Sequence, residues 1–132
     1  MSFSILGAGS ALPSCVKTND DLAQILDTSD QWIYTRTGIR RRHVITTETI
    51  TGMAAEAARK ALAAAGITPE DLDYIVCPTV GGDYITPGLG CTLQEALGAH
   101  CPAIDINAGC SGFLYTLYVV DVIFAIKKAR YV

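Results

Sequence analysis

The sequence predicts an α/β fold with a mostly parallel sheet and a buried helix directly after a candidate nucleophile. Apolar, strand-like runs alternate with helical segments, which is typical of parallel strands joined by helical crossovers. Half of the 132 residues are hydrophobic and 17% are charged, so the chain can bury a substantial core. The most apolar helical segment follows Cys110 immediately. These observations favour a single α/β unit over residues 1–132.

The run Ser4–Ser10 is apolar and punctuated by glycine, which predicts a buried first strand that leads into a loop. Gly7 and Gly9 match the dinucleotide-binding fingerprint poorly, because Leu12 stands at the third glycine position. A Rossmann nucleotide site is therefore not expected at this turn.

Two helix starts and a polar strand follow the first loop. Asn19 is expected to cap a helix whose first turn is acidic. A second helix is expected to begin at Ser29 and to end at Gly38. Arg40–Ile45 is typical of a short polar or edge strand.

Thr51–Ala65 is the clearest amphipathic helix, and its alanine-rich face predicts close packing on a sheet. Glu56 and Lys60 form a favourable i,i+4 pair, and Gly66 is expected to close the helix. The remaining expected elements are the turn Thr68–Asp71, the strand Asp73–Pro78, the loop Thr79–Gly90, the short helix Cys91–Leu97, the strand Cys101–Asn107, the helix Ser111–Ala129 and the start of a strand at Tyr131–Val132.

Composition excludes several classes of protein. A net charge of −3 gives no general electrostatic reason to bind nucleic acid or an anionic membrane. The longest apolar stretch, Phe113–Ile126, is interrupted by Asp121 and is shorter than the roughly 20 residues that span a bilayer. The N-terminus lacks the basic and apolar segments of a signal peptide. The five cysteines are an odd number without a C-x-x-C pair, which favours a reducing cytoplasm.

Cys110 is the candidate nucleophile. It lies where an apolar strand turns into an apolar helix, and a helix N-terminus favours a thiolate. Small residues on both sides leave room for a substrate to approach the sulfur. This arrangement points to acyl transfer through a thioester. His43 and His100 are interpreted as surface or packing residues, and Asp121 as a satisfied buried carboxylate. No spacing of ligands predicts a metal site.

Three motifs resemble one known family. Gly109–Phe113 is similar to the nucleophile turn of the thiolase superfamily, and most closely to that of the β-ketoacyl-acyl-carrier-protein synthase III family. Thr28–Ile39 resembles that family's Thr-Ser-Asp-Glu-Trp-Ile-x-Thr-Arg-Thr-Gly-Ile signature, and Asn19–Leu22 precedes it at the family spacing. The resemblance covers essentially the whole chain and implies the N-terminal half of a thiolase-like fold.

The resemblance also implies roles for individual residues. Cys110 would accept an acyl group from acyl-CoA, with its backbone N–H contributing to an oxyanion hole. Trp32 would stack on the adenine of coenzyme A, and Thr28 and Arg36 would line the same entrance. Thr86 falls where an acyl-channel residue is expected, on a loop that crosses the dimer interface in the family. Acyl-CoA would be a substrate, and no separate cofactor is implied.

The implied reaction is fatty-acid initiation, in which the acyl group on Cys110 condenses decarboxylatively with malonyl-acyl carrier protein. The histidine and asparagine that this second step needs come from the other half of the family's chain, and His43, His100 and Asn107 do not match them. The 132 residues are therefore interpreted as an N-terminal half domain, inactive in condensation when alone. Two alternatives remain open: a polyketide or alkylquinolone-type starter synthase, and a non-catalytic half subunit that binds CoA or carrier protein.

Overall fold

The computed structural model describes residues 3–126 and 129–132, and the chain divides into two compact units. The larger unit comprises Met1–Ala11 and Thr49–Val132, and the smaller unit comprises Leu12–Glu48. Cys110 and Thr86 belong to the larger unit. Thr28, Trp32 and Arg36 belong to the smaller one.

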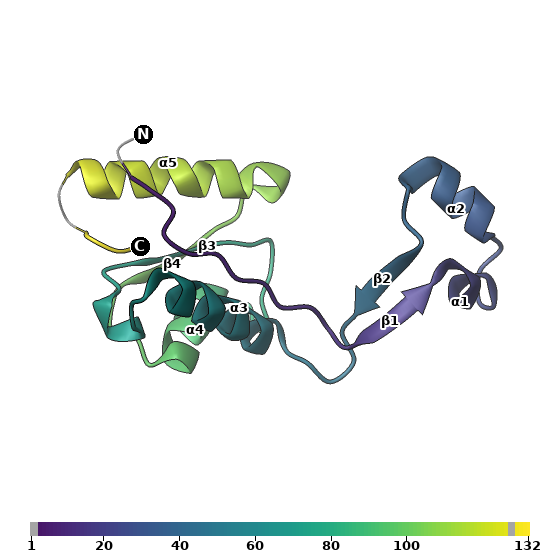
Figure 1. Ribbon diagram of the computed structural model, residues 1–132, viewed down its shortest axis with the longest axis horizontal. Coiled ribbons are helices and arrows are strands. Elements are labelled where there is room, and N and C mark those ends of the chain that lie inside the picture. Colours follow the sequence, from purple (N-terminus) through teal and green to yellow (C-terminus); the bar gives the residue numbers. More distant parts are fainter. Residues whose placement is uncertain (1–2, 127–128) are drawn as a thin grey trace. The chain divides into compact units, whose positions relative to one another are not determined.

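The larger unit is built on a parallel pair of strands. β3 (Ile75–Pro78) pairs with β4 (Ala103–Ile106), and the register runs from Ile75 opposite Ala103 to Pro78 opposite Ile106. Helices α3 (Ile50–Ala65) and α4 (Leu89–Leu97) pack on one face of this pair, and α5 (Gly112–Ala125) lies on the other (Figure 1). The parallel pairing and the helices that join the strands confirm the predicted α/β class.

Side-chain alternation along β3 explains the two layers. Ile75 and Cys77 point to the α3 and α4 side and are buried, whereas Val76 points to α5. Gly112, at the start of α5, would bring an added Cβ to 3.4 Å from Pro78 Cβ, so the helix begins close to the sheet. The buried core consists of Ala55, Ile75, Cys77, Leu89, Leu93, Ala99 and Cys101.

The predicted strand Ser4–Ser10 is wrong, because the described residues 3–11 form no strand. This segment instead runs close over α3. A Cβ on Gly7 or Gly9 would overlap the carbonyl oxygens of Ala61 and Ala57 respectively. The two glycines therefore serve close backbone packing rather than a nucleotide loop.

Helix α3 follows its prediction within one residue. The Thr49 side chain accepts a hydrogen bond from the Gly52 N–H at the N-terminus. Gly66 ends the helix in the left-handed conformation with φ of 70°. Lys60 Nζ lies 2.6 Å from Glu56 Oε1, which confirms the i,i+4 pair.

Helix α5 is covered on one face only within the larger unit. Gly112, Thr116 and Val120 are buried against the sheet. The opposite face exposes a set of large apolar side chains, which we call the open face of α5: Leu114, Tyr115, Tyr118 and Val122. No helix in the described ranges is both long and apolar enough to cross a membrane.

The end of the chain differs from its prediction. Helix α5 ends at Ala125 rather than Ala129, and residues 127–128 of the predicted helix lie outside the described residues. Tyr131 and Val132 form no strand. The Tyr131 carbonyl nevertheless accepts a hydrogen bond of 2.9 Å from the Asp73 N–H, and the Asp73 carboxylate accepts bonds from the N–H groups of Arg130 and Tyr131.

The smaller unit contains an antiparallel strand pair and two short helices. β1 (Cys15–Thr18), which was not predicted, pairs with β2 (Arg41–Val44), close to the expected edge strand. α1 (Asn19–Ala23) and α2 (Asp30–Thr37) lie between these strands in the chain. Thr18, not Asn19, caps α1, because its hydroxyl accepts the Asp21 N–H while the Asp21 carboxylate accepts the Thr18 N–H. The expected ends of α2 at Ser29 and Gly38 are confirmed.

Candidate active site

Cys110 lies on a tight turn that joins β4 to α5. Gly109–Ser111 form a single 3₁₀ turn, and α5 starts at the next residue, Gly112. Gly109 has a φ of 51°, a conformation that glycine adopts without steric cost. Cys110 itself is exposed. The turn therefore presents a thiol to solvent at the beginning of an apolar helix.

Asp105 holds the strand that leads to Cys110. Its two carboxylate oxygens accept hydrogen bonds from the N–H groups of Leu89 (2.8 Å) and Gly90 (2.6 Å), the first residues of α4. A Cβ on Gly88 would overlap the Asp105 carboxylate, so this approach needs glycine. A carboxylate at a helix N-terminus satisfies backbone donors and complements the helix dipole. The contact ties β4 to α4 at Asp105, four residues before the nucleophile turn begins at Gly109.

A cavity of about 390 Å³ lies beside this contact. It is lined by residues 79–85 together with Gly88, Asp105 and Asn107. Thr86 is exposed on the same loop but is not among the lining residues, so its role in an acyl channel stays a prediction. Asp83, on the same loop, accepts hydrogen bonds from the N–H groups of Ile50 and Thr51 and so anchors the loop to α3.

The five cysteines are all free, but their environments differ. Burial, followed by the nearby Asp105 carboxylate, raises the pKa of Cys77 to about 11. Burial also raises the pKa of Cys101. These two thiols therefore stay protonated at neutral pH, whereas Cys91 and Cys110 are exposed to reagents.

In the smaller unit, α2 brings Trp32 and Arg36 together one turn apart. The Arg36 guanidinium carbon lies 4.4 Å from the centroid of the indole ring, and its Nη1 donates a 3.3 Å hydrogen bond to the Trp32 carbonyl. Trp32 keeps 53% of its surface exposed. A cation beside an exposed aromatic face suits a ligand that joins a flat base to phosphates.

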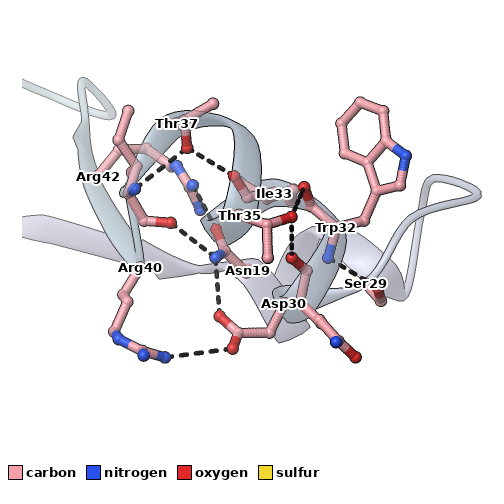
Figure 2. A network of polar contacts seen from close by, with 11 residues as sticks. Asn19, Ser29, Asp30, Trp32, Ile33, Thr35, Thr37, Arg40 and Arg42 are labelled. Atoms are coloured by element: carbon pink, nitrogen blue, oxygen red, sulfur yellow. Dashed lines mark hydrogen bonds and ion pairs between the residues drawn. The ribbon is translucent and has the colours of Figure 1, made fainter.

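Thr28 lies just before α2. Its hydroxyl oxygen is buried and has no hydrogen-bond partner among the residues that the structure describes. Ser29 Oγ accepts the Trp32 N–H and caps the helix (Figure 2). The sequence motif thus places an unpaired buried hydroxyl, a helix cap and an exposed indole within five residues.

Asn19 is the site-supporting residue that the sequence did not reveal. It is 1% exposed, and its side chain joins Asp30, Ile39 and Arg42 (Figure 2). Its position before an acidic turn is also the pattern of a helix cap, which concealed this role. Its contact with Ile39, 20 positions further along the chain, depends on the tertiary structure and is not visible in the local sequence.

The histidines take packing or surface positions. His43 Nδ1 donates a 2.6 Å hydrogen bond to the Pro13 carbonyl, and His100 is exposed. Within the described ranges, no group of three or more histidine, cysteine or acidic residues could hold a metal ion.

A scan against protein-family models found no match. Among curated proteins, the chain is 50% identical over 119 residues to a β-ketoacyl-acyl-carrier-protein synthase III of Xanthomonas euvesicatoria, and 53% identical over 119 residues to that of Xylella fastidiosa. Each match covers 89% of this chain and 37% of the relative. The chain therefore spans little more than a third of the length of these relatives.

Solved structures agree with the sequence matches. The 3-oxoacyl-acyl-carrier-protein synthase III of Aquifex aeolicus superposes with a TM-score of 0.92 at 46% identity, over 96% of this chain and 41% of that one. A priming β-ketosynthase of a polyketide biosynthetic pathway superposes with a TM-score of 0.84 at 35% identity, over 90% and 36% respectively. The fold is a partial thiolase-like fold. More specifically, the chain is similar to the N-terminal part of β-ketoacyl-acyl-carrier-protein synthase III.

Proposed function

We propose that this chain carries the acyl-accepting part of a condensing acyltransferase of fatty-acid initiation. The observation that carries the proposal is the exposed Cys110 thiol on the turn before α5, in a chain whose relatives are condensing synthases. The buried, protonated thiols of Cys77 and Cys101 are unsuited to this chemistry.

In the proposed step, Cys110 Sγ attacks the carbonyl carbon of acyl-CoA as a thiolate. The bond from this carbon to the CoA sulfur breaks and the bond to Sγ forms. CoA leaves as a thiolate and takes up a proton from solvent, which balances the proton that the Cys110 thiol released on ionisation. Charge develops on the carbonyl oxygen in the transition state, and the Cys110 backbone N–H is a donor at the turn that could stabilise it. The product is an acyl thioester on the enzyme.

We propose that the nucleotide end of acyl-CoA is held by the smaller unit. Trp32 offers an exposed indole face to the adenine, and Arg36 offers a positive charge to the phosphates. Thr28 offers a buried hydroxyl with a free hydrogen-bonding capacity. We therefore assign all three residues to the entrance for CoA, as the resemblance of Thr28–Ile39 to the family signature implies.

Condensation with malonyl-acyl carrier protein is proposed to need protein beyond these 132 residues. The resemblance assigns the histidine and asparagine of that step to the part of the relatives that this chain does not span. The open face of α5 fits a further protein layer that would pack on it, because four large apolar side chains gathered there are unusual on a free surface. The chain alone should therefore load an acyl group without condensing it.

A homodimer in the cytoplasm is the proposed setting of the complete enzyme. The loop 79–87 exposes Val80, Tyr84 and Ile85, with Ile85 fully exposed. Apolar side chains on an exposed loop suit a protein interface. On this loop, Thr86 is proposed to help form the partner's acyl channel.

A second candidate is the priming step of a polyketide pathway. The similarity to a priming β-ketosynthase favours it specifically. The acyl-loading step would be the same, and the two candidates would differ in the acyl group that the complete enzyme prefers.

The proposal is tested by mass spectrometry of the chain after incubation with acetyl-CoA. We expect one acetyl group on the peptide that contains Cys110, and none in the Cys110→Ser variant. Cys91→Ser is the matched control, because Cys91 is also exposed, and it should acylate normally. An unmodified Cys110 peptide would contradict acyl transfer and favour a non-catalytic half subunit.

A further inference from the structure

Asn19 is a buried polar residue whose hydrogen bonds reach both ends of α2. Its Nδ2 donates to Asp30 Oδ1 at the start of the helix and to the Ile39 carbonyl just beyond its end, each at 2.8 Å. Its backbone N–H donates to the Arg40 carbonyl at 3.1 Å. One amide therefore joins the first residue of α2 to the residue just beyond its C-cap. Figure 2 shows the bond from Asn19 to Asp30, on the helix that carries Trp32.

The orientation of this amide is determined by its partners. Asn19 Oδ1 accepts a hydrogen bond of 2.5 Å from Arg42, and Nδ2 faces two acceptors. Asp30 also binds Arg40, whose Nη1 lies 3.3 Å from Oδ2. An oxygen in place of Nδ2 would face the Asp30 carboxylate and the Ile39 carbonyl without a proton between them.

Helix α2 depends on this network because it has little packing of its own. It is eight residues long, and none of its residues is buried. A helix this short is marginal without tertiary support. Polar contacts to Asn19 at both ends therefore supply much of what holds the helix, and with it the spacing of Trp32 and Arg36.

We propose that Asn19 is a positioning residue for the Trp32–Arg36 pair, setting the geometry in which the pair receives the nucleotide end of CoA. The inference rests on the proposed function of that pair. Asn19 does not touch the ligand. It acts through Asp30 and Ile39, which it holds at either end of the helix.

The test compares the unsubstituted chain with the isosteric variant Asn19→Asp. Trp32 is the only tryptophan of the chain, so its fluorescence reports directly on the proposed site during titration with CoA. We expect Asn19→Asp to raise the dissociation constant for CoA about tenfold, because two acceptors lose their donor. The maximal rate of Cys110 acylation at saturating acetyl-CoA should stay unchanged, while the half-saturating concentration rises.

Two further variants separate positioning from loss of folding. Gln24→Glu makes the same amide-to-carboxylate change at the exposed end of α1 and should alter CoA binding by no more than about twofold. Asn19→Asp combined with Asp30→Asn restores a donor opposite the new carboxylate, so it should recover part of the lost affinity.

The outcomes are distinguishable. If the unsubstituted chain binds no CoA, the proposed function is wrong, and this inference is wrong with it. If the unsubstituted chain binds CoA and Asn19→Asp binds it equally well, the inference alone is wrong. Equal loss of affinity and of maximal acylation rate, without recovery in the double variant, would reject positioning in favour of a general folding role.

Discussion

The Arg36 guanidinium lies 4.4 Å from the centroid of the Trp32 ring, one helical turn further along α2. The Arg36 guanidinium also donates a hydrogen bond to the Trp32 carbonyl. Arg36 therefore contacts both the backbone and the ring of the tryptophan. The contact restricts an exposed indole before any ligand arrives. Pre-organised aromatic side chains bind at a lower entropic cost than mobile ones.

Arg36→Ala should weaken CoA binding about fivefold. The variant loses the positive charge for the phosphates, an exposed ion pair worth up to about 1 kcal/mol on binding. It also loses the cation that restrains the indole. Fluorescence titration of Trp32 measures the change. Gln31→Ala, on an exposed neighbouring position of α2, is the control and should bind normally. Unchanged affinity in Arg36→Ala would remove this arginine from the site.

Alkylation should distinguish the cysteines by their surroundings. At pH 8, iodoacetamide should modify Cys110 and Cys91 in the folded chain, because both are exposed. Cys77, whose pKa is about 11, should react only after denaturation, because burial disfavours its thiolate. Peptide mass spectrometry against time measures each rate. Equal rates for Cys77 in native and denatured protein would contradict the buried position.

Gly9→Ala should destabilise the larger unit by about 1–3 kcal/mol. The new methyl group would overlap the Ala57 carbonyl oxygen and lie 2.8 Å from Lys60 Cβ, so the N-terminal segment must move away from α3. Urea denaturation followed by circular dichroism measures the loss. Gly81→Ala is the matched control, since an added Cβ there meets nothing within 4 Å. Equal stability of the two variants would be inconsistent with the close approach.

The smaller unit should lose stability in acid through Glu48. The N–H and then the hydroxyl of Ser14, followed by the Thr46 N–H, donate to this carboxylate and hold its pKa well below the ordinary value of 4.5. Because the folded-state pKa is lower than the unfolded one, these bonds stabilise the unit above about pH 4.5. The stabilisation disappears as the pH falls through the folded-state pKa.

Glu48→Gln should therefore be less stable than the unsubstituted chain at pH 7, and the difference should narrow in strong acid. Unfolding followed by Trp32 fluorescence reports on this unit, which contains the only tryptophan. Asp27→Asn, on an exposed position of the same unit, controls for the loss of one negative charge. A difference that stays constant from pH 7 to pH 2 would show that the charge of Glu48 is not responsible.

Local sequence patterns predicted most of the larger unit. The helix α3 was recognisable because its alanine-rich face, its i,i+4 pair and its terminal glycine all agree with one structure. The segment Ser4–Ser10 was misjudged because an apolar run does not show whether its backbone joins a sheet. The expected burial is also wrong, since Ile5 and Leu6 are exposed. Close approach to α3, which determines its conformation, depends on residues about 50 positions away.

The candidate site was predictable where a motif is continuous in the sequence. The turn around Cys110 and the pair of Trp32 and Arg36 each lie within a short segment, so spacing alone brought their residues together. The contacts of Asp105 with α4 and of Asn19 with Ile39 join segments 15 to 20 residues apart. Such contacts depend on how the elements fold back, which no local pattern encodes.

The open face of α5 also has a consequence for reactivity. Cys110 is joined to this helix through one short turn, so a small rotation or shift of the helix moves the sulfur with it. Protein that packs on Leu114 and Tyr118 would therefore fix the orientation of the Cys110 sulfur as well as bury apolar surface. Assembly and catalytic competence would then be acquired together, because α5 links the packed surface to Cys110.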